Sequence, residues 1–443
     1  MEYKRRKELN AYSLAGIGIG GVIGAGFFLG SNLAIKEAGP SIILAFILGG
    51  FIMAQVLGSM TSITINRPVQ GSFRVYTDKY LGRTMGFYLG WTIFVSSILI
   101  LASEAIATGI FFSYWVPSIP PSLFALFSLL LIIFINRLSV RLFSYVESFM
   151  SIFKIVMMII FIFIGLFFII NNHDSINFNN FGNFSSIFPN GLLGFLRSML
   201  IVIFTYGGIS TVAMAAYEVK NPHKEIPKAT IIMTIGIVLL YIVSMLIIIL
   251  IIDWSTIDTL VSPFVQVFDK MNYGFGQDFI NVTILIATLS VMIGAYYGSL
   301  QMLVSLSSAK EAKKALSMKN SKGFYFNAWI TTGISVFLFV LSSFIIGPKL
   351  FNYLISASTY FAFFNWIINL WTYIVWYKKK DASEKYLSPL IKGPSMAIVT
   401  IIIIIILTIF SLSVADFRIG FYSAVVMTIF ISMYYKMIEA KRN

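Results

Sequence analysis

The sequence predicts an all-α integral membrane protein with twelve transmembrane helices, on three observations. Of its 443 residues, 58% are hydrophobic and 11% are charged, which leaves too few polar side chains to cover a soluble globule. Twelve apolar runs are long enough to cross a hydrocarbon layer of about 30 Å as helices. Lysine and arginine number 26 in alternate connecting segments and 4 in the others, and positive residues accumulate in cytoplasmic loops. Both termini are therefore expected in the cytoplasm.

The twelve runs follow one another with short connections. The first is too long and too rich in glycine for a signal peptide, so we expect it to be retained. The runs cover residues 12–35, 40–63, 84–115, 121–136, 142–170, 191–217, 228–252, 278–307, 326–346, 350–377, 394–413 and 418–435.

The composition argues against catalytic and metal chemistry. The chain has no cysteine and two histidines, and His173 and His223 fall in separate predicted loops, so no metal site, cofactor or enzymatic activity is expected. The net charge of +14 is spread over short loops that face an anionic lipid surface, which explains it without nucleic acid. No phosphate-binding loop is present that would couple the protein to ATP.

The first run contains the segment GIGIGGVIGAGFFLG at 16–30, with seven glycines and no charge. A glycine inside a helix costs about 1 kcal/mol relative to alanine, and irregular backbone at membrane depth is tolerated only where it lines a cavity or is packed by protein. One interpretation is a break in the helix near Val22 to Gly26. The other is close helix packing through Gly16, Gly20 and Gly24, which lie four residues apart.

A second interruption favours the break. The sixth run reads IVIFTYGGIST at 201–211, with two glycines in mid-helix. Two broken helices are typical of transporters built from two inverted five-helix repeats. We therefore expect one domain, 1–443, with repeats at 1–170 and 191–377 and two added helices at 394–435. A broken helix exposes free N–H and C=O groups, which can hold a carboxylate and an ammonium.

Most of the recognisable motifs lie in five places: GIGIGGVIGAGFFLGSNLAIKEAGPS at 16–41, PVQGSFRVYTDKYLGRTMGFYLGW at 68–91, Glu104, YGGISTVAMAAYEVKNPHKEIPKA at 206–229 and ISASTYFAFFNWI at 355–367. Together they resemble the amino acid, polyamine and organocation transporters, and within them the bacterial amino acid permeases. The resemblance covers nearly the whole chain. It implies a leucine-transporter-type fold and a secondary active transporter in the plasma membrane that moves amino acids by alternating access.

The resemblance also implies a substrate site at the two interruptions. The segment of helix one that matches the family's carboxylate-binding amides consists of Ile23, Gly24, Ala25 and Gly26. The matching part of helix six, which supplies carbonyls to the α-amino group and a lid, contains Phe204, Tyr206, Gly207, Gly208 and Ser210. Many relatives have a hydroxyl residue in place of Ala25 and a glutamate in place of Ser210, so these positions depart from the family pattern.

Lys154 is the most informative charge in the chain. At 1.5 Å per residue it lies about 20 Å from Arg141 along its helix, and a charge at that depth is usually buried and functional. By resemblance, its ammonium takes the place of a sodium ion and ties helices one, five and eight together in a coupling or gating role. The alternative is a fixed structural cation held by carbonyls.

The other charges within the runs are weaker signals. Glu104 either lines the pocket or makes a structural hydrogen bond. Glu147 and Arg197 lie near helix ends, where long side chains usually reach toward the membrane surface.

Glu104 is the one acidic residue near the predicted pocket, so we expect a neutral amino acid as substrate. Proton-coupled, sodium-independent uptake is favoured over exchange, and a non-transporting amino acid sensor or receptor subunit is the further alternative. The expected partners are the amino acid, protons and the lipid bilayer, and the sequence predicts no oligomeric state.

Overall fold

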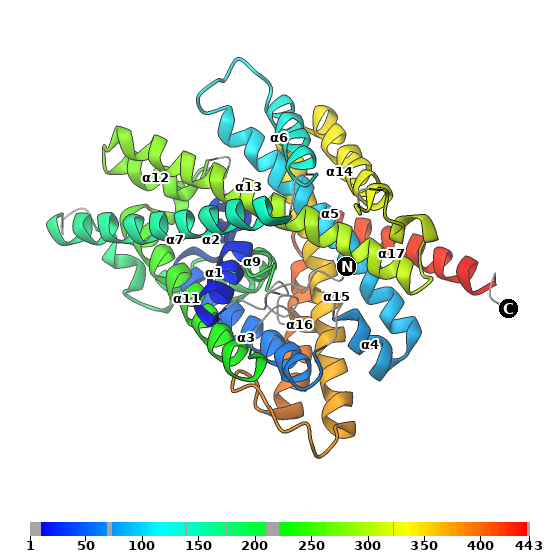
Figure 1. Ribbon diagram of the computed structural model, residues 1–443. Coiled ribbons are helices and arrows are strands. Elements are labelled where there is room, and N and C mark those ends of the chain that lie inside the picture. Colours follow the sequence, from blue (N-terminus) through cyan, green and yellow to red (C-terminus); the bar gives the residue numbers. More distant parts are fainter. Residues whose placement is uncertain are drawn as a thin grey trace.

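The computed structural model describes residues 10–68, 73–137, 140–172, 176–209, 221–259, 261–321 and 323–440, and all regular secondary structure in these ranges is helical (Figure 1). Nine helical segments of this part of the chain are long and apolar enough to cross a membrane. The predicted class, an all-helical membrane protein, is thereby confirmed. The count of twelve crossings and the inverted repeats stay predictions.

Long apolar helices account for most of the described chain. Two shorter apolar helices, at 11–22 and 121–135, accompany the nine segments. The helices are α1 (Ala11–Val22), α2 (Ser31–Ala38), α3 (Ile42–Asn66), α4 (Arg74–Leu81), α5 (Arg83–Phe112), α6 (Pro121–Ile135), α7 (Val140–Asn171), α8 (Phe184–Ile187), α9 (Gly191–Thr205), α11 (Pro222–Ile251), α12 (Pro263–Lys270), α13 (Gly274–Ser308), α14 (Phe326–Ile346), α15 (Leu350–Lys379), α16 (Gly393–Ser411) and α17 (Ala415–Ala440).

Two of the nine segments contain a sharp turn. In each, a glycine with positive φ (Gly39, +60°; Gly347, +73°) is followed directly by proline at the start of a 3-10 turn. Glycine adopts this backbone conformation without a steric cost, and proline is favoured where the next helix begins. Helices α2 and α3, and likewise α14 and α15, are therefore separate helices joined by a tight corner.

Helices α5 and α13 pack along one another at the centre of the molecule (Figure 1). Helix α5 also packs against α15 and α6, while α1 packs against α11, α7 and α13. Helices α6 and α14 lie at one edge, and α17 lies at another. The first predicted run thus packs through α1 against α13, while α9 of the sixth run packs against α2, α3, α15 and α16.

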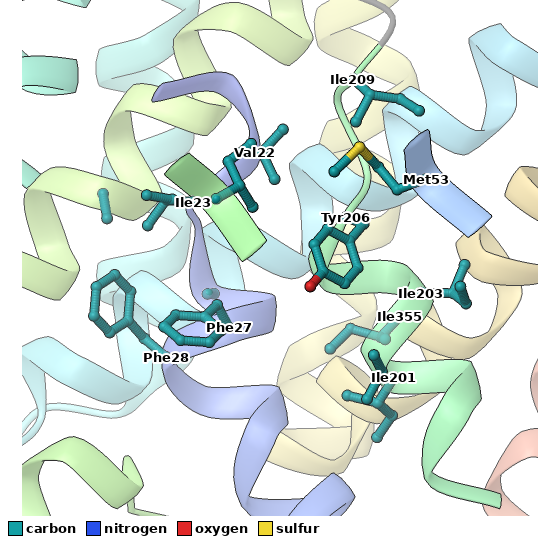
Figure 2. Packing of buried hydrophobic residues seen from close by; sticks show 14 of the residues in the cluster. Val22, Ile23, Phe27, Phe28, Met53, Ile201, Ile203, Tyr206, Ile209 and Ile355 are labelled. Atoms are coloured by element: carbon teal, nitrogen blue, oxygen red, sulfur yellow. The ribbon is translucent and has the colours of Figure 1, made fainter. Parts of the chain in front are cut away.

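A cluster of buried aromatic residues surrounds the part of the first predicted run that follows the interruption. Its members are Phe27, Phe28, Phe46, Tyr241 and Phe264, all without solvent exposure. The ring of Phe27 stacks on that of Tyr241 with centroids 3.8 Å apart, and Phe264 lies 5.2 Å from Phe27. Figure 2 shows Phe27 and Phe28 beside the interrupted chain, with Tyr206 on the opposite segment. This packing fixes the helical segment that follows the interruption.

Candidate functional site

The first predicted run is interrupted within its glycine-rich segment. Helix α1 ends at Val22, and Ile23 has an extended backbone (φ −77°, ψ 104°). The chain becomes helical again at Ala25 and continues as a π-helix over Gly26–Gly30. The carbonyl of Gly24 accepts hydrogen bonds from the N–H groups of residues 27 and 28 at 3.1 and 3.2 Å. The interruption therefore leaves backbone groups on both sides available to other partners.

Glu104 binds the first amide of the resumed helix. Its carboxylate oxygens accept the N–H of Ala25 at 3.1 and 3.0 Å, and the side chain is 2% exposed. The N-terminal end of a helix carries partial positive charge and favours an anion. The sequence left two roles open for Glu104, and the structure places it both in a hydrogen bond to the first run and on the wall of a cavity.

Lys154 binds the other end of the interruption. Its ammonium, fully buried, donates to the carbonyls of Gly20 and Ile23 (3.1 Å for Ile23) and to the hydroxyl of Ser290 at 2.9 Å. The last carbonyls of a helix have no partner within it, so the lysine replaces hydrogen bonds that the broken helix lacks. One side chain from α7 thereby joins α1 to α13.

Glu147 is a site residue that the sequence reasoning missed. The expectation that it reaches toward the membrane surface is wrong, because the side chain is 8% exposed and accepts the Ser290 hydroxyl at 2.9 Å. Glu147, Ser151 and Lys154 lie four and three residues apart, on one face of α7. That spacing to a buried lysine was the available signal. Arg197 keeps about a third of its side chain exposed and donates to the Ser413 hydroxyl at 2.8 Å.

A cavity of about 200 Å³ lies against the interruption. From the middle of the molecule it follows α5 back from Glu104 to Ile93 and α13 onward from Ser290 to Met302. The cavity thus runs toward the side of the helix bundle that holds the N-terminus of α5 and the C-termini of α3 and α13. None of the five residues of the aromatic cluster belongs to the described cavity wall. Further lining residues include Gly21, Val22, Gly24, Met60, Thr64, Phe204, Gly207, Gly208, Gly294, Gly298, Asn365 and Trp366.

The described end of the sixth run meets the interruption of the first. Helix α9 ends at Thr205, and residues 206–209 form turns. Gly208 has a φ of +84°, and a Cβ on it would come within 2.5 Å of the Gly21 carbonyl oxygen. The ring of Phe204 covers Gly26 so closely that a Cβ there would overlap it. The two glycine-containing segments are therefore packed backbone to backbone.

Not every predicted substrate residue faces the cavity. Tyr206 is fully buried, and its hydroxyl donates to the Phe46 carbonyl at 2.9 Å, toward α3 (Figure 2). The side chains of Ile23 and Ala25 are buried as well and do not belong to the cavity wall that is described. Ser210 and the rest of the predicted sixth run, to residue 217, lie outside the described residues.

A buried ion pair lies beside the open end of the cavity. Arg74 of α4 donates to the carboxylate of Glu311, just after α13, at 2.6 Å, and both side chains are almost completely buried. Burial raises the pKa of the Glu311 carboxyl, and the Arg74 guanidinium acts in the opposite direction. Phe73 and Tyr76, on either side of Arg74, line the cavity. The pair therefore joins the cavity rim to the end of α13.

Known proteins are similar in sequence to this chain over nearly its whole length. Residues 14–442 match the family model described as amino acid permease. The amino-acid permease RocC of Bacillus subtilis (strain 168) is 31% identical over 461 residues, covering 99% of this chain and 95% of RocC. The amino acid permease YvbW of the same organism is 32% identical over 367 residues, 82% of each chain. The aromatic amino acid transport protein AroP of Escherichia coli (strain K12) is 31% identical over 352 residues, covering 79% of this chain and 77% of AroP.

The resemblance read from the motifs is thus confirmed over nearly every described helix. The matched range includes the interrupted first run, the buried Lys154 and the cavity between α5 and α13. The relatives are named permeases and transport proteins, so the chain is a transporter and not an enzyme. It is a multi-pass membrane protein that belongs to the amino acid permease family.

Proposed function

We propose that this protein takes up a neutral amino acid together with protons, independently of sodium, by alternating access across the plasma membrane. The proposal includes twelve membrane crossings, two inverted five-helix repeats followed by two added helices, and cytoplasmic termini. The observation that carries it is the hydrogen bond between Glu104 and the Ala25 amide. A carboxylate of the protein there occupies the position proposed for the carboxylate of the substrate.

The direction in which the cavity opens supports alternating access. With the lysine- and arginine-rich loops in the cytoplasm, the ends of α3 and α13 face inward. The cavity then leads from the interruption to the cytoplasm, and the aromatic cluster closes the external side. This arrangement supports the assignment of the structure to an inward-open state of the proposed cycle.

The charges on the cavity wall support a neutral substrate. Among the described lining residues, Glu104 is the one charged side chain. The α-carboxylate is proposed to bind the amides of residues 24–26, where the helix resumes and its partial positive charge is directed. Phe204 and Gly207, at the end of α9, are proposed to cover the bound molecule, as their places on the wall allow. A charged substrate side chain would find no further side chain of opposite charge on this wall.

Coupling to protons follows from competition for one amide. Ala25 has a single N–H, and two carboxylates close together in a dry site repel each other. A proton bound by Glu104 removes that repulsion and frees the amide for the substrate. Proton binding and substrate binding then favour each other, as linkage requires. Lys154 contributes a fixed positive charge at the opposite end of the interruption, so no sodium ion is needed there.

Uptake by the purified protein in liposomes tests this function. Radiolabelled neutral amino acids should accumulate under an inward proton gradient, and a protonophore should abolish the accumulation. Replacing sodium with choline should leave uptake unchanged. Uptake that depends on preloaded amino acid instead of the gradient would establish exchange. Binding without any uptake would establish a sensor.

A further inference from the structure

Two glycines on α13 leave part of the cavity empty. Gly294 and Gly298 lie one helical turn apart on the cavity wall, and a Cβ built on either meets no atom within 4 Å. At Gly24, in contrast, a Cβ would come within 2.6 Å of Glu104 and 2.9 Å of Val291. Glycine costs about 1 kcal/mol relative to alanine in a helix. On α13 no closer packing of the protein offsets that cost. The two glycines therefore keep space free on the cavity wall for a bound molecule.

The space begins beside the proposed carboxylate position. Val291 lies against Gly24, and the two glycines follow it by three and seven residues along α13, about 5 and 10 Å at the rise of an α-helix. Helix α5 contributes the facing wall, with Ile100 and the serines at 96 and 97. The result is a groove that starts at the backbone end of a bound amino acid and continues far enough for a long side chain.

The groove is uncharged and mostly apolar beyond Glu104. Its far part is lined by Ile93, Met302 and Trp366. Two of the nearby polar groups have partners: the Ser96 hydroxyl donates to the Ser358 carbonyl at 3.3 Å, and the Asn365 carbonyl oxygen accepts from Thr92 at 2.6 Å. The side-chain oxygen of Asn369, also on the wall, is buried and has no described hydrogen-bond partner, so it is the polar exception in the groove. Burial of apolar side-chain area is therefore the main source of affinity that the groove offers.

We infer that Gly294 and Gly298 form the subsite for the substrate's side chain and select large, uncharged amino acids, aromatic ones foremost. This inference rests on the proposed function and specifies its substrate. A flat ring lies against a helix surface that lacks Cβ atoms, whereas alanine or glycine leaves the groove unfilled. A side chain added at either glycine shortens the groove without touching the amides that bind the substrate's backbone.

The test compares phenylalanine with alanine on the purified full-length protein in liposomes. In the wild type, phenylalanine should bind at least about tenfold more tightly than alanine, as expected for a filled apolar pocket. Gly294→Leu should reduce phenylalanine binding and uptake by about tenfold or more and leave alanine within about twofold. Gly294→Ala and Gly298→Leu provide graded versions should the larger change prevent folding. Gly274→Leu is the matched control, because that glycine of α13 also faces open space but lies outside the described cavity wall.

Each result decides between distinct possibilities. Selective loss of phenylalanine in the α13 variants, with the control unchanged, supports the subsite. Equal loss of both substrates in folded variants overturns it, because the groove would then be a common path. A wild type that transports alanine but not phenylalanine also overturns the subsite and leaves the proposed function intact. A wild type that transports no amino acid overturns the proposed function, and the subsite with it.

Discussion

At the end of α1, the carbonyls of Gly20 and Ile23 accept hydrogen bonds from Lys154, whereas the amide of Ala25, where the helix resumes, donates to Glu104. The lysine has three partners and is sealed from solvent. The glutamate has one described backbone partner for its carboxylate and lines the cavity. The carbonyl end of the interruption is thus held by a cation sealed inside the protein, while the amide end is held by a carboxylate on the cavity wall, which the proposed function lets a ligand replace.

Removing the lysine is expected to have the largest effect. In Lys154→Ala, the two carbonyls lose their donor in a dry site, at a cost of about 1 to 3 kcal/mol each, so uptake should fall about a hundredfold or more. Equilibrium binding should fall less, because the role proposed for the lysine is to stabilise one state of the cycle and not to contact the substrate. Uptake and binding are measured on the same preparation, with Lys349→Ala, an exposed cation, as the control. Sodium-dependent uptake by the wild type would contradict this role of Lys154.

Crowding the amide end is expected to have the second largest effect. In Gly26→Val the new side chain would overlap the Phe204 ring, and in Gly24→Val it would press on Glu104. Overpacking costs about 1 to 3 kcal/mol, so binding should weaken about tenfold to a hundredfold. Gly16→Val is the control on the same run, since a Cβ there meets nothing within 4 Å. Equal affinity in all three folded variants would remove the substrate site from this end.

Glu104→Gln tests whether the amide end of the interruption binds the coupled proton. Glutamine is uncharged, as protonated Glu104 is, so it does not repel a substrate carboxylate at the Ala25 amide, but it cannot bind or release a proton. We expect exchange of internal for external amino acid to stay within about threefold of the wild type, the size of a modest hydrogen-bond change. Accumulation driven by a proton gradient should be lost. The measurement is gradient-driven uptake beside counterflow in the same liposomes, and accumulation that survives would assign the proton to another group.

A smaller effect is expected at the residue that covers the amide end. Phe204→Ala should weaken binding about fivefold to tenfold, the effect of losing one aromatic contact. Phe163→Ala is the matched control, because Phe163 on α7 is 68% exposed on the lipid side of the bundle. Binding titrations on both variants compare the two positions. Equal losses would indicate general packing in place of a cover over the substrate.

The sequence predicted those parts of the molecule that depend on local chemistry. Apolar runs and loop charges predicted the helical membrane class, and the glycines of 16–30 placed the interruption between Val22 and Gly26, where α1 ends. The depth of Lys154 predicted a buried charge. The structure shows Lys154 held by backbone carbonyls, and its coupling role stays a prediction.

Properties that depend on which way a helix is turned could not be predicted in the same manner. Distance from the helix end suggested that Glu147 reaches toward the surface, but its face of α7 is turned toward α13. The side chain of Tyr206 is directed toward α3, so the predicted substrate contact of this residue rests on its backbone carbonyl. Gly294 and Gly298 gave no signal, because a glycine that preserves empty space and one that permits close packing look alike in a sequence.

The contacts of Gly208 and Gly26 have different consequences for how the sequence can drift over time. A side chain at 208 would meet the backbone oxygen of Gly21, and no substitution elsewhere can delete a backbone oxygen, so position 208 has no compensating mutation. A side chain at 26 would meet the ring of Phe204, which a smaller residue at 204 would remove. Paired replacement can therefore open an evolutionary route at 26 and 204, while 208 is confined to glycine for as long as the two segments remain in contact.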